Sequence, residues 1–238
     1  MSPSASPIDP TPAASPSRLP DLAQLQSWAR ALGFASLGVA RLALPESVHV
    51  GLRAWLAAGM HGEMDYLSRH ERLRTHPEEL VPGAISALMV SIDYTPPEPD
   101  WRERAWSTIA DDQRAYVARY ALGRDYHKVV RQRLQQLATT LGEVIGPFGY
   151  RAFCDSAPVL EVELATRAGL GWRGKHTLLI HPQSGSMSFI GTLYTDLPLE
   201  ETGMGPGHCG QCARCIEICP RSEEHTSELQ SRVDISYA

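Results

Sequence analysis

The sequence predicts a mixed α/β (α+β) sandwich, because segments with helical and strand patterns alternate along the chain without an internal repeat. The clearest helix is a single apolar stripe at helical spacing from Val130 to Ile145. The clearest strand is the apolar, β-branched run from Ala87 to Ile92. With 238 residues, of which 43% are hydrophobic and 21% charged, the chain is long and apolar enough to bury a core.

Composition divides the chain into four parts. Residues 1–19 are dominated by Ser, Pro and Ala, and we expect a disordered tail because such a segment buries too little apolar surface to offset the entropy of ordering. Residues 20–200 carry the periodic segments and form the main domain. Residues 201–220 hold four of the five cysteines, and residues 221–238 show no core periodicity.

The first half of the main domain begins with a helix. Asp21 precedes an amphipathic stripe from Leu22 to Leu32, and Gly33 supplies a stop signal. The other elements expected here are a strand at 34–39, a helix at 46–59, a loop with a short helix at 59–77, a strand at 87–92, a Pro- and Trp-rich loop at 96–112 and a strand at 116–121.

The second half of the main domain holds the long helix, which ends at Gly146. The turn residues at 182–186 predict a hairpin between the two apolar runs that flank them. The expected elements are the helix at 130–145, a strand at 150–154, a helix from Pro158 to Gly169, and strands at 177–180 and 189–194.

Charge and hydropathy argue against several classes of protein. A net charge of -5 argues against a surface that coats nucleic acid generally, although it leaves room for a local basic patch. No apolar run approaches the ~20 residues that span a bilayer, and the N-terminus lacks the features of a secretory signal. We therefore expect a cytoplasmic protein with no membrane partner, whose clustered cysteines bind metal or do chemistry rather than form disulfides.

The strongest chemical motif is the cysteine run that contains Cys209, Cys212, Cys215 and Cys219. Two, two and three residues separate successive thiols and a proline follows the last, as in bacterial ferredoxins that bind a 4Fe-4S cluster. A zinc site is the alternative, but structural zinc sites usually separate two Cys-x-x-Cys pairs by a longer loop. The four cysteines are therefore predicted iron-sulfur ligands, and no cysteine follows Cys219.

Two aspartates at element junctions each have two possible roles. Asp125 is either the N-cap of the long helix or a site residue, since a tyrosine and a histidine follow it. Asp155 is either a turn or capping carboxylate, or a proton donor that faces a pocket at the end of a core strand. Its neighbour Cys154 is expected to be a small buried hydrophobe.

A glycine-rich stretch runs from Gly169 to His176. It has more glycines than packing alone is expected to need, and such segments let the backbone approach a ligand closely. The spacing of a phosphate-binding P-loop is absent. The segment from Ser184 to Ser186 is interpreted as a turn.

Together these residues resemble the epoxyqueuosine reductase family, the cobalamin-dependent iron-sulfur enzymes of tRNA queuosine synthesis. The resemblance covers roughly residues 20–220 and depends on several long motifs in the right order as well as on the cysteine run. The motifs are HGEMDYL (61–67), RYALGRDYHKV (119–129), DSAPVLE (155–161), AGLGWRGKHTLLI (168–180) and GSMSF (185–189).

The resemblance implies a cobalamin-binding domain at 20–200 and a partial ferredoxin-like domain at 201–220. It implies reduction of epoxyqueuosine to queuosine in tRNA, in which electrons pass from 4Fe-4S clusters to cobalamin and Asp155 is the general acid. An epoxide oxygen leaves poorly as an alkoxide and needs a proton in the transition state. We therefore expect the pocket to raise the pKa of the Asp155 carboxyl by desolvation.

The resemblance also implies contacts and partners. We expect a monomer that acts on tRNA carrying epoxyqueuosine and takes electrons from a donor of unknown identity. The expected cobalamin contacts are Arg74, Tyr126, Asp155, Lys175, His176 and Ser186. The candidate contacts to tRNA phosphates are Arg119, Arg124, Lys128, Arg131 and Arg133, although a solvated helix face is the favoured interpretation for the last three.

The chain departs from the family pattern after Pro220. Residues 221–231 read RSEEHTSELQS, which matches the translation of a sequencing-adapter oligonucleotide beginning AGATCGGAAGAG. We therefore interpret residues 221–238 as an artefact. Two 4Fe-4S clusters would need eight thiolates and the run supplies four, so we expect an inactive or impaired fragment.

Two other functions are compatible with parts of the sequence. One is a related cobalamin iron-sulfur reductase such as a reductive dehalogenase, which the signal-free N-terminus disfavours. The other is a ferredoxin-like electron carrier or a cobalamin-binding module without catalysis of its own.

Overall fold

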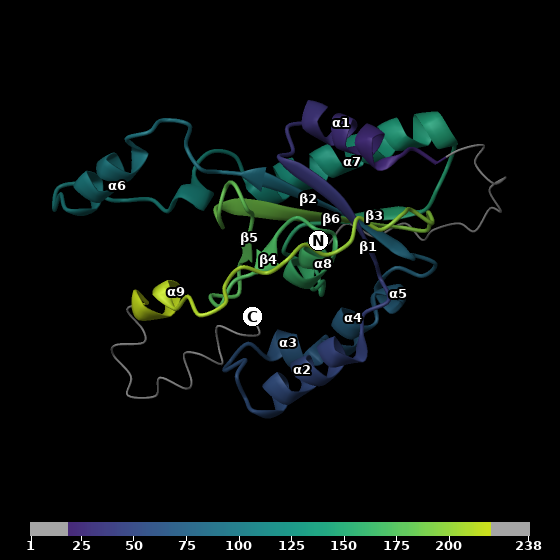
Figure 1. The fold of residues 1–238 in the computed structure, drawn as a ribbon, viewed down its shortest axis with the longest axis horizontal. Coiled ribbons are helices and arrows are strands. Elements are labelled where there is room, and N and C mark those ends of the chain that lie inside the picture. Colours follow the sequence, from purple (N-terminus) through teal and green to yellow (C-terminus); the bar gives the residue numbers. More distant parts are fainter. Residues whose placement is uncertain (1–18, 220–238) are drawn as a thin grey trace, which may run out of the picture.

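The computed structural model describes residues 19–219, and its centre is a four-stranded antiparallel sheet (Figure 1). The strand order in this sheet is β1-β2-β6-β3, and β4 and β5 form a separate two-stranded sheet. The strands are β1 (Ser36–Arg41), β2 (Ser86–Asp93), β3 (Tyr150–Phe153), β4 (Trp172–Arg173), β5 (Leu179–Ile180) and β6 (Ser188–Thr195).

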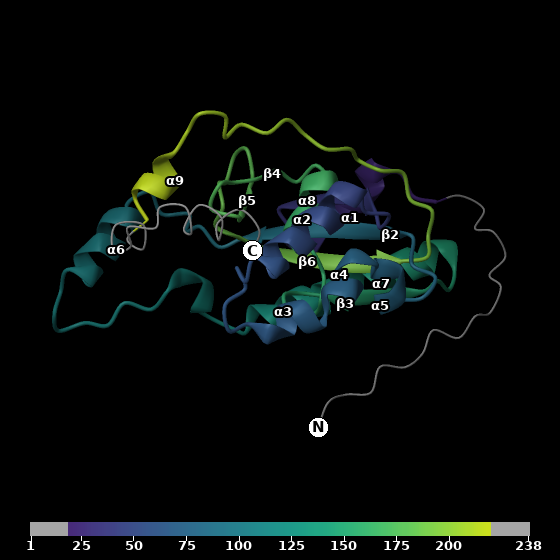
Figure 2. The ribbon, with the colours of Figure 1, turned by 90° about the horizontal axis from the view of Figure 1, so that it is seen from below.

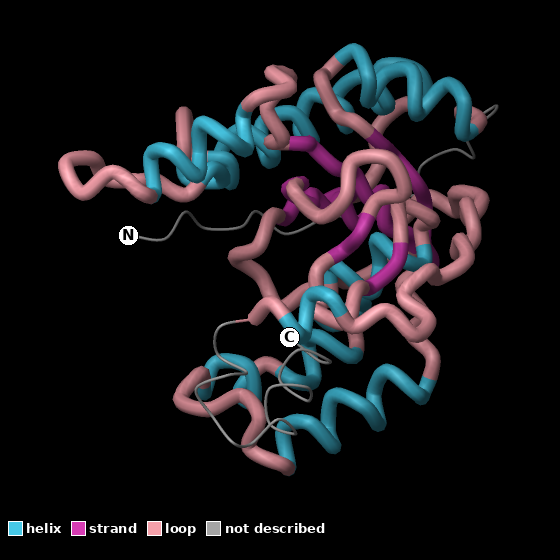
Figure 3. Tube along the Cα trace, turned by 60° about the vertical axis from the view of Figure 1, so that its left-hand side comes forward, coloured by secondary structure: helices cyan, strands magenta, loops and turns pink. Residues whose placement is uncertain are grey.

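Helices cover both faces of the large sheet, as Figures 1 and 3 show. Helices α1 and α7 pack on one face and α8 packs on the other. Helix α6 projects away from the sheet in Figures 1 and 2. The helices are α1 (Leu22–Ala31), α2 (Glu46–Ala57), α3 (Asp65–Arg69), α4 (Glu71–Thr75), α5 (Pro77–Leu80), α6 (Trp101–Ile109), α7 (Tyr126–Ile145), α8 (Glu161–Arg167) and α9 (Arg214–Glu217), with a short 3-10 helix at Arg119–Ala121.

Strand β2 explains why the sheet needs helices on both faces. Successive side chains of a strand point to opposite sides. Leu88 and Val90 pack in one core with α1 and α7, whereas Ala87 and Met89 pack in the other core with α8. The continuous apolar run in the sequence therefore reflects burial on both faces, and the predicted mixed α/β class is confirmed.

Each of the two helices over the first core begins directly after an aspartate that the sequence marks as a possible cap. The Asp21 side chain accepts a hydrogen bond from the Gln24 backbone N–H at 2.8 Å, and Asp125 accepts one from the His127 backbone N–H at 3.0 Å. Each carboxylate satisfies a donor that the first helical turn would leave unpaired. The buried stripe of α7 consists of Val130, Leu134, Leu137, Ala138 and Leu141.

The predicted loop at 96–112 is wrong, because residues 101–109 form α6. Only Ala105 of this helix is buried, so the apolar stripe that predicts a helix is missing from its sequence. Arg104 instead forms ion pairs with Asp100 at 3.4 Å and Glu98 at 3.7 Å on the exposed surface. Burial against the rest of the protein therefore does not account for this helix.

The predicted strand at 116–121 is also wrong. This segment contains only the 3-10 turn at 119–121, and Val117 and Tyr120 are more than half exposed. A strand needs a hydrogen-bonding neighbour and a packed face, and the described residues give this segment neither.

The predicted hairpin between 177–180 and 189–194 does not form. Strand β5 pairs with β4 through Trp172 and Ile180, whereas β6 pairs with β2 and β3. Three smaller differences concern boundaries: β1 begins at Ser36 rather than Phe34, α7 begins at Tyr126 rather than Val130, and α8 begins at Glu161 rather than Pro158. The other predicted elements are present.

Two expectations lie at the ends of the chain. The predicted tail at 1–19 and the terminal segment at 221–238 fall outside the described residues, except for Leu19, which packs against the first core. Among residues 19–219, no helix has the length and apolar character that crossing a membrane requires.

Close approach of the two layers depends on a glycine in β1. A Cβ atom added to Gly38 would lie 2.0 Å from the carbonyl oxygen of Ala168, at the C-terminal end of α8. Backbone atoms cannot move aside as a flexible side chain does, so any side chain here would push α8 off the sheet.

We predict that Gly38→Ala lowers the free energy of unfolding by about 1–3 kcal/mol or more, the range for overpacked cores. Gly205→Ala is the matched control, because a Cβ atom there meets nothing within 4 Å, and its effect should stay within about 0.5 kcal/mol. Urea denaturation of both variants measures the difference. Equal midpoints for the two variants would contradict the packing described here.

Candidate active site

The candidate site is a cavity of about 240 Å³ where the start of β6 meets the start of α7 and the chain that follows β3. Its wall combines aromatic rings with two carboxyl groups, a combination that suits an active site. The lining residues are Tyr94, Tyr120, Tyr126, Asp155, Glu161, Val162, Leu178, Leu179, Ser186, Ser188, Phe189 and Ile190.

Asp155 reaches this cavity from the end of β3. It adopts a φ of 55°, in the left-handed region that non-glycine residues rarely occupy. Its side chain is 46% exposed and accepts a hydrogen bond from the Tyr126 hydroxyl. The structure therefore places Asp155 at the pocket, as the second of its two possible roles requires.

Tyr126 is held in position by stacking. Its ring stacks on Phe189 with centroids 4.0 Å apart and an interplanar angle of 8°, and the His127 ring lies on it at 4.0 Å and 26°. Burial and the neighbouring carboxylate of Asp155 raise the pKa of the Tyr126 phenol. The hydroxyl thus stays protonated and donates to Asp155.

His127 links two carboxylates. Its Nδ1 lies 3.0 Å from Asp125 Oδ1 and its Nε2 lies 3.5 Å from Asp155 Oδ2. The hydrogen bond with His127 holds the pKa of Asp125 below its usual range. Asp125 therefore has both roles that its sequence position allows, because it caps α7 and also orients a site residue.

Glu161 is the site residue that the sequence analysis did not single out. Its carboxylate oxygens each accept the Asp155 backbone N–H at 3.2 Å. Burial, followed by the charge of Asp155, raises the pKa of Glu161 to about 8. The sequence feature that could have indicated Glu161 is its place in the DSAPVLE motif. A carboxylate in the first turn of a helix is, however, common because it stabilises the helix.

Cys154 is fully buried, which confirms its predicted character as a small hydrophobe. Its thiol donates to the Ile190 carbonyl oxygen at 3.4 Å, across the β3–β6 pair. Burial raises the pKa of this thiol, with Glu161 as the next contributor. An uncharged thiol of this kind is not a nucleophile.

The predicted cobalamin contacts are not all in one place. Tyr126, Asp155 and Ser186 line the cavity together. Arg74 on α4 interacts electrostatically with Glu161, and burial lowers the pKa of its guanidinium. Lys175 instead donates to the Gly210 carbonyl at 2.9 Å, and the His176 ring accepts the Leu178 backbone N–H at 3.2 Å.

The glycine-rich stretch is explained by packing, contrary to the expectation from its sequence. A Cβ atom on Gly171 would lie 2.2 Å from the Ile180 carbonyl oxygen, and one on Gly169 would lie 2.6 Å from the Gly203 carbonyl oxygen. A Cβ atom on Gly174 would meet the His176 ring at 2.6 Å. These glycines allow β4, β5 and the following chain to fit together, so they are not evidence for a ligand.

The four cysteines of the predicted cluster lie around α9 and are at least partly accessible to solvent. The described residues contain no group of three or more His, Cys, Asp or Glu side chains that could hold a metal ion. The donor chemistry suits a 4Fe-4S cluster, but the arrangement of the thiols in this structure does not.

The candidate phosphate contacts differ in their surroundings. Arg133 donates to the Gly33 carbonyl at 3.3 Å, and Arg119 lies over the Trp101 ring at 5.1 Å. Arg124, Lys128 and Arg131 are exposed. The exposed cations therefore gather at the N-terminal end of α7, next to the cavity.

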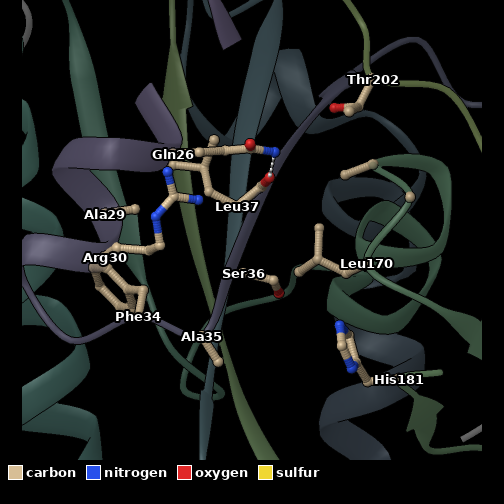
Figure 4. A pocket seen from close by; sticks show the side chains of 12 residues that line it. Gln26, Ala29, Arg30, Phe34, Ala35, Ser36, Leu37, Leu170, His181 and Thr202 are labelled. Carbon is tan, nitrogen blue, oxygen red and sulfur yellow. Dashed lines mark hydrogen bonds between the residues drawn. The ribbon is translucent and has the colours of Figure 1, made fainter. Parts of the chain in front are cut away.

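A second cavity of about 200 Å³ lies between α1, β1 and the chain after α8 (Figure 4). Gln26 on its wall donates to the Leu37 carbonyl at 3.1 Å, and Arg30 and His181 also line it. None of the site residues predicted from the sequence is among its described lining residues. The carboxylate-lined cavity is therefore the better candidate.

Comparison with known proteins gives consistent results. The family model "Epoxyqueuosine reductase QueG, DUF1730" matches residues 74–156. The epoxyqueuosine reductase of Alicycliphilus denitrificans is 48% identical over 200 residues, which cover 83% of this chain and 55% of that protein. The chain thus spans about half the length of the curated relatives it matches.

Two solved structures share the fold. One is an epoxyqueuosine reductase with an epoxyqueuosine-modified tRNA-Tyr stem loop, with a TM-score of 0.68 and 22% identity over 83% of this chain and 51% of that one. The other is the Bacillus subtilis epoxyqueuosine reductase with an aspartate-bearing catalytic loop swung out of its active site, with a TM-score of 0.69, 22% identity and the same coverage. At this identity the likeness shows the fold alone. Sequence identity to curated relatives and the family model agree that the chain belongs to the epoxyqueuosine reductase family.

Proposed function

We propose that this chain is the part of an epoxyqueuosine reductase that binds cobalamin and supplies the general acid for reducing epoxyqueuosine to queuosine in tRNA. The observation that carries this proposal is the Asp155 carboxylate, which faces a cavity and is hydrogen-bonded by Tyr126, in a chain of this family. The main domain would be residues 20–200, and residues 201–220 would belong to a ferredoxin-like domain.

The overall reaction takes up two electrons and two protons, breaks both C–O bonds of the epoxide and releases one water, leaving an alkene in the ring. Bound cobalamin would supply the reducing equivalents. Asp155 would give a proton to the departing oxygen, which avoids a free alkoxide in the transition state. Tyr126 and His127 would aim the Asp155 carboxyl, since both contact the same oxygen of it.

The residues around the cavity suit one edge of a large, flat, amide-rich group such as cobalamin, most of which would lie outside a cavity of about 240 Å³. Tyr94, Phe189 and Tyr126 form a row of contacting rings on the wall, in which Tyr126 stacks on Phe189 and Tyr94 is tilted against Phe189 at 37°. The apolar surface of such a row packs well against a macrocycle. Arg74 Nε and Thr95 Oγ1 are among the buried polar atoms without a hydrogen-bond partner in the described residues; Arg74 interacts with the lining residue Glu161, and Thr95 follows the lining residue Tyr94. Amide groups of the cofactor could satisfy both atoms. Ser186, Lys175 and His176 remain predicted contacts.

The iron-sulfur assignment is supported by the spacing of Cys209, Cys212, Cys215 and Cys219. Their positions around α9 do not form a cluster site in the described part of the chain. Lys175 joins this segment to the main domain through the Gly210 carbonyl.

The proposed substrate is tRNA, and its modified base must enter the cavity. The support is the exposed cations Arg124, Lys128 and Arg131 beside the cavity, together with the stem loop bound by a structural relative. We also propose that the protein is a monomer in the cytoplasm, where tRNA is found. It would take electrons from a separate donor.

We predict that Asp155→Asn preserves cobalamin binding and lowers turnover by about 10²–10⁴-fold, the usual contribution of general acid catalysis. Binding is measured by absorbance titration of the 238-residue chain with cobalamin, and turnover by anaerobic assay of the gene product at its full length on an epoxyqueuosine stem loop.

Asp196→Asn is the matched control, because Asp196 lies past the opposite end of β6 and accepts the Gly149 N–H at 2.9 Å. Undiminished turnover by Asp155→Asn would exclude Asp155 as the acid. Absence of corrin absorbance in the parent chain would instead favour an electron carrier over a cobalamin enzyme.

A further inference from the structure

The carboxyl group of Glu161 takes no part in the proposed proton transfer, yet it contacts the residue that does. Its two oxygens share the Asp155 backbone N–H at 3.2 Å each. Glu161 opens α8 and Asp155 follows β3, so this bond closes the loop of residues 156–160 across the edge of the cavity.

That hydrogen bond acts on an unfavourable backbone conformation. The φ of 55° at Asp155 lies in the left-handed region, which aspartate enters more readily than most residues with a Cβ atom but still at a steric cost, so surrounding contacts help to hold it. Different neighbours contact the side chain and the backbone of Asp155. Tyr126 and His127 contact its carboxylate, whereas Glu161 accepts a hydrogen bond from its backbone N–H.

We propose that Glu161 is a positioning residue for Asp155: by accepting the Asp155 backbone N–H, it holds the left-handed turn that aims the Asp155 carboxylate into the cavity. This inference rests on the proposed function in one respect: the direction of the Asp155 carboxylate matters only if Asp155 is the general acid. The hydrogen bond and its effect on the backbone exist whatever reaction the cavity supports.

The surroundings of Glu161 make this hydrogen bond dependent on pH. Burial and the charge of Asp155 raise the pKa of Glu161 to about 8, whereas the N–H of Asp155 acts in the opposite direction. An ionised acceptor makes the stronger hydrogen bond, so Glu161 should hold Asp155 more tightly as pH rises toward 8 and above. The groups that face Glu161 are Asp155 and Cys154 after β3, Tyr126 on α7, Tyr194 and Thr192 on β6, and Arg74 on α4.

The first test follows the Asp155 amide by NMR in the 238-residue chain. Glu161→Ala removes the acceptor, and Glu161→Gln keeps a carbonyl oxygen in its place. Glu163→Gln is the control, because Glu163 lies on the same helix and pairs with Arg173 at 2.7 Å. We expect amide exchange at Asp155 to accelerate by about 10-fold in Glu161→Ala and to stay near the parent value in the other two variants.

Unchanged exchange in Glu161→Ala would overturn the proposal. Should that variant fail to fold, the parent chain decides, because the chemical shift of the Asp155 amide must change as the Glu161 carboxyl that accepts it titrates in an NMR pH series. An Asp155 amide shift that stays constant while Glu161 titrates would show that the hydrogen bond is absent, which also overturns the proposal.

The second test is kinetic and uses the gene product at its full length. We expect Glu161→Ala to lower kcat by about 10-fold with KM for the stem loop unchanged, and Glu161→Gln to recover most of that loss. Equal losses in both variants, or a loss confined to KM, would overturn the positioning role. If even the parent fails to reduce epoxyqueuosine, the proposed function fails, while the amide exchange still decides the role of Glu161.

The same carboxyl predicts a pH dependence of stability. Because its folded pKa of about 8 lies above the ordinary 4.5, the folded chain binds more protons than the unfolded chain between these values, and stability falls as pH rises through this window. Glu161→Gln cannot ionise, so its free energy of unfolding should rise relative to the parent across the window. A constant difference between the two in urea denaturation from pH 5 to 8 would contradict a raised pKa.

Discussion

The close packing of α7 against β6 determines the geometry of the whole site. A Cβ atom on Gly191 would lie 2.5 Å from Val130 Cγ1, so only glycine lets the helix come this near to the strand. That approach lets Tyr126, at the first position of α7, stack on Phe189 of β6. Strand β3 pairs with the other edge of β6 and ends at the same place, which brings Asp155 to the Tyr126 hydroxyl.

Electrostatics then differentiate three carboxyl groups that lie close together. Asp125 has a lowered pKa because it accepts hydrogen bonds from His127, whereas burial raises the pKa of Glu161. Asp155 lies between them, 46% exposed and in contact with a phenol and an imidazole. Neighbouring groups with pKa values moved in opposite directions are typical of sites that handle protons.

The sequence predicts much of this arrangement and misses parts that depend on tertiary context. The stripe of α7, the cap at Asp125 and the delivery of Asp155 by β3 follow from local patterns. The helix α6 lacks an apolar stripe, and local patterns cannot show which strand β5 pairs with. Glu161 was missed because its desolvation arises only when α8 packs beneath β6 and β3.

The proposed cobalamin and substrate site is the cavity at the start of α7. The most direct test is a crystal structure of the chain with cobalamin bound. We expect the corrin ring beside Tyr126 and Phe189, with the Asp155 carboxylate facing it and the Glu161 hydrogen bond intact. A ring bound in the cavity lined by Gln26 and Arg30, or an Asp155 side chain that points away from the ring, would contradict this proposal.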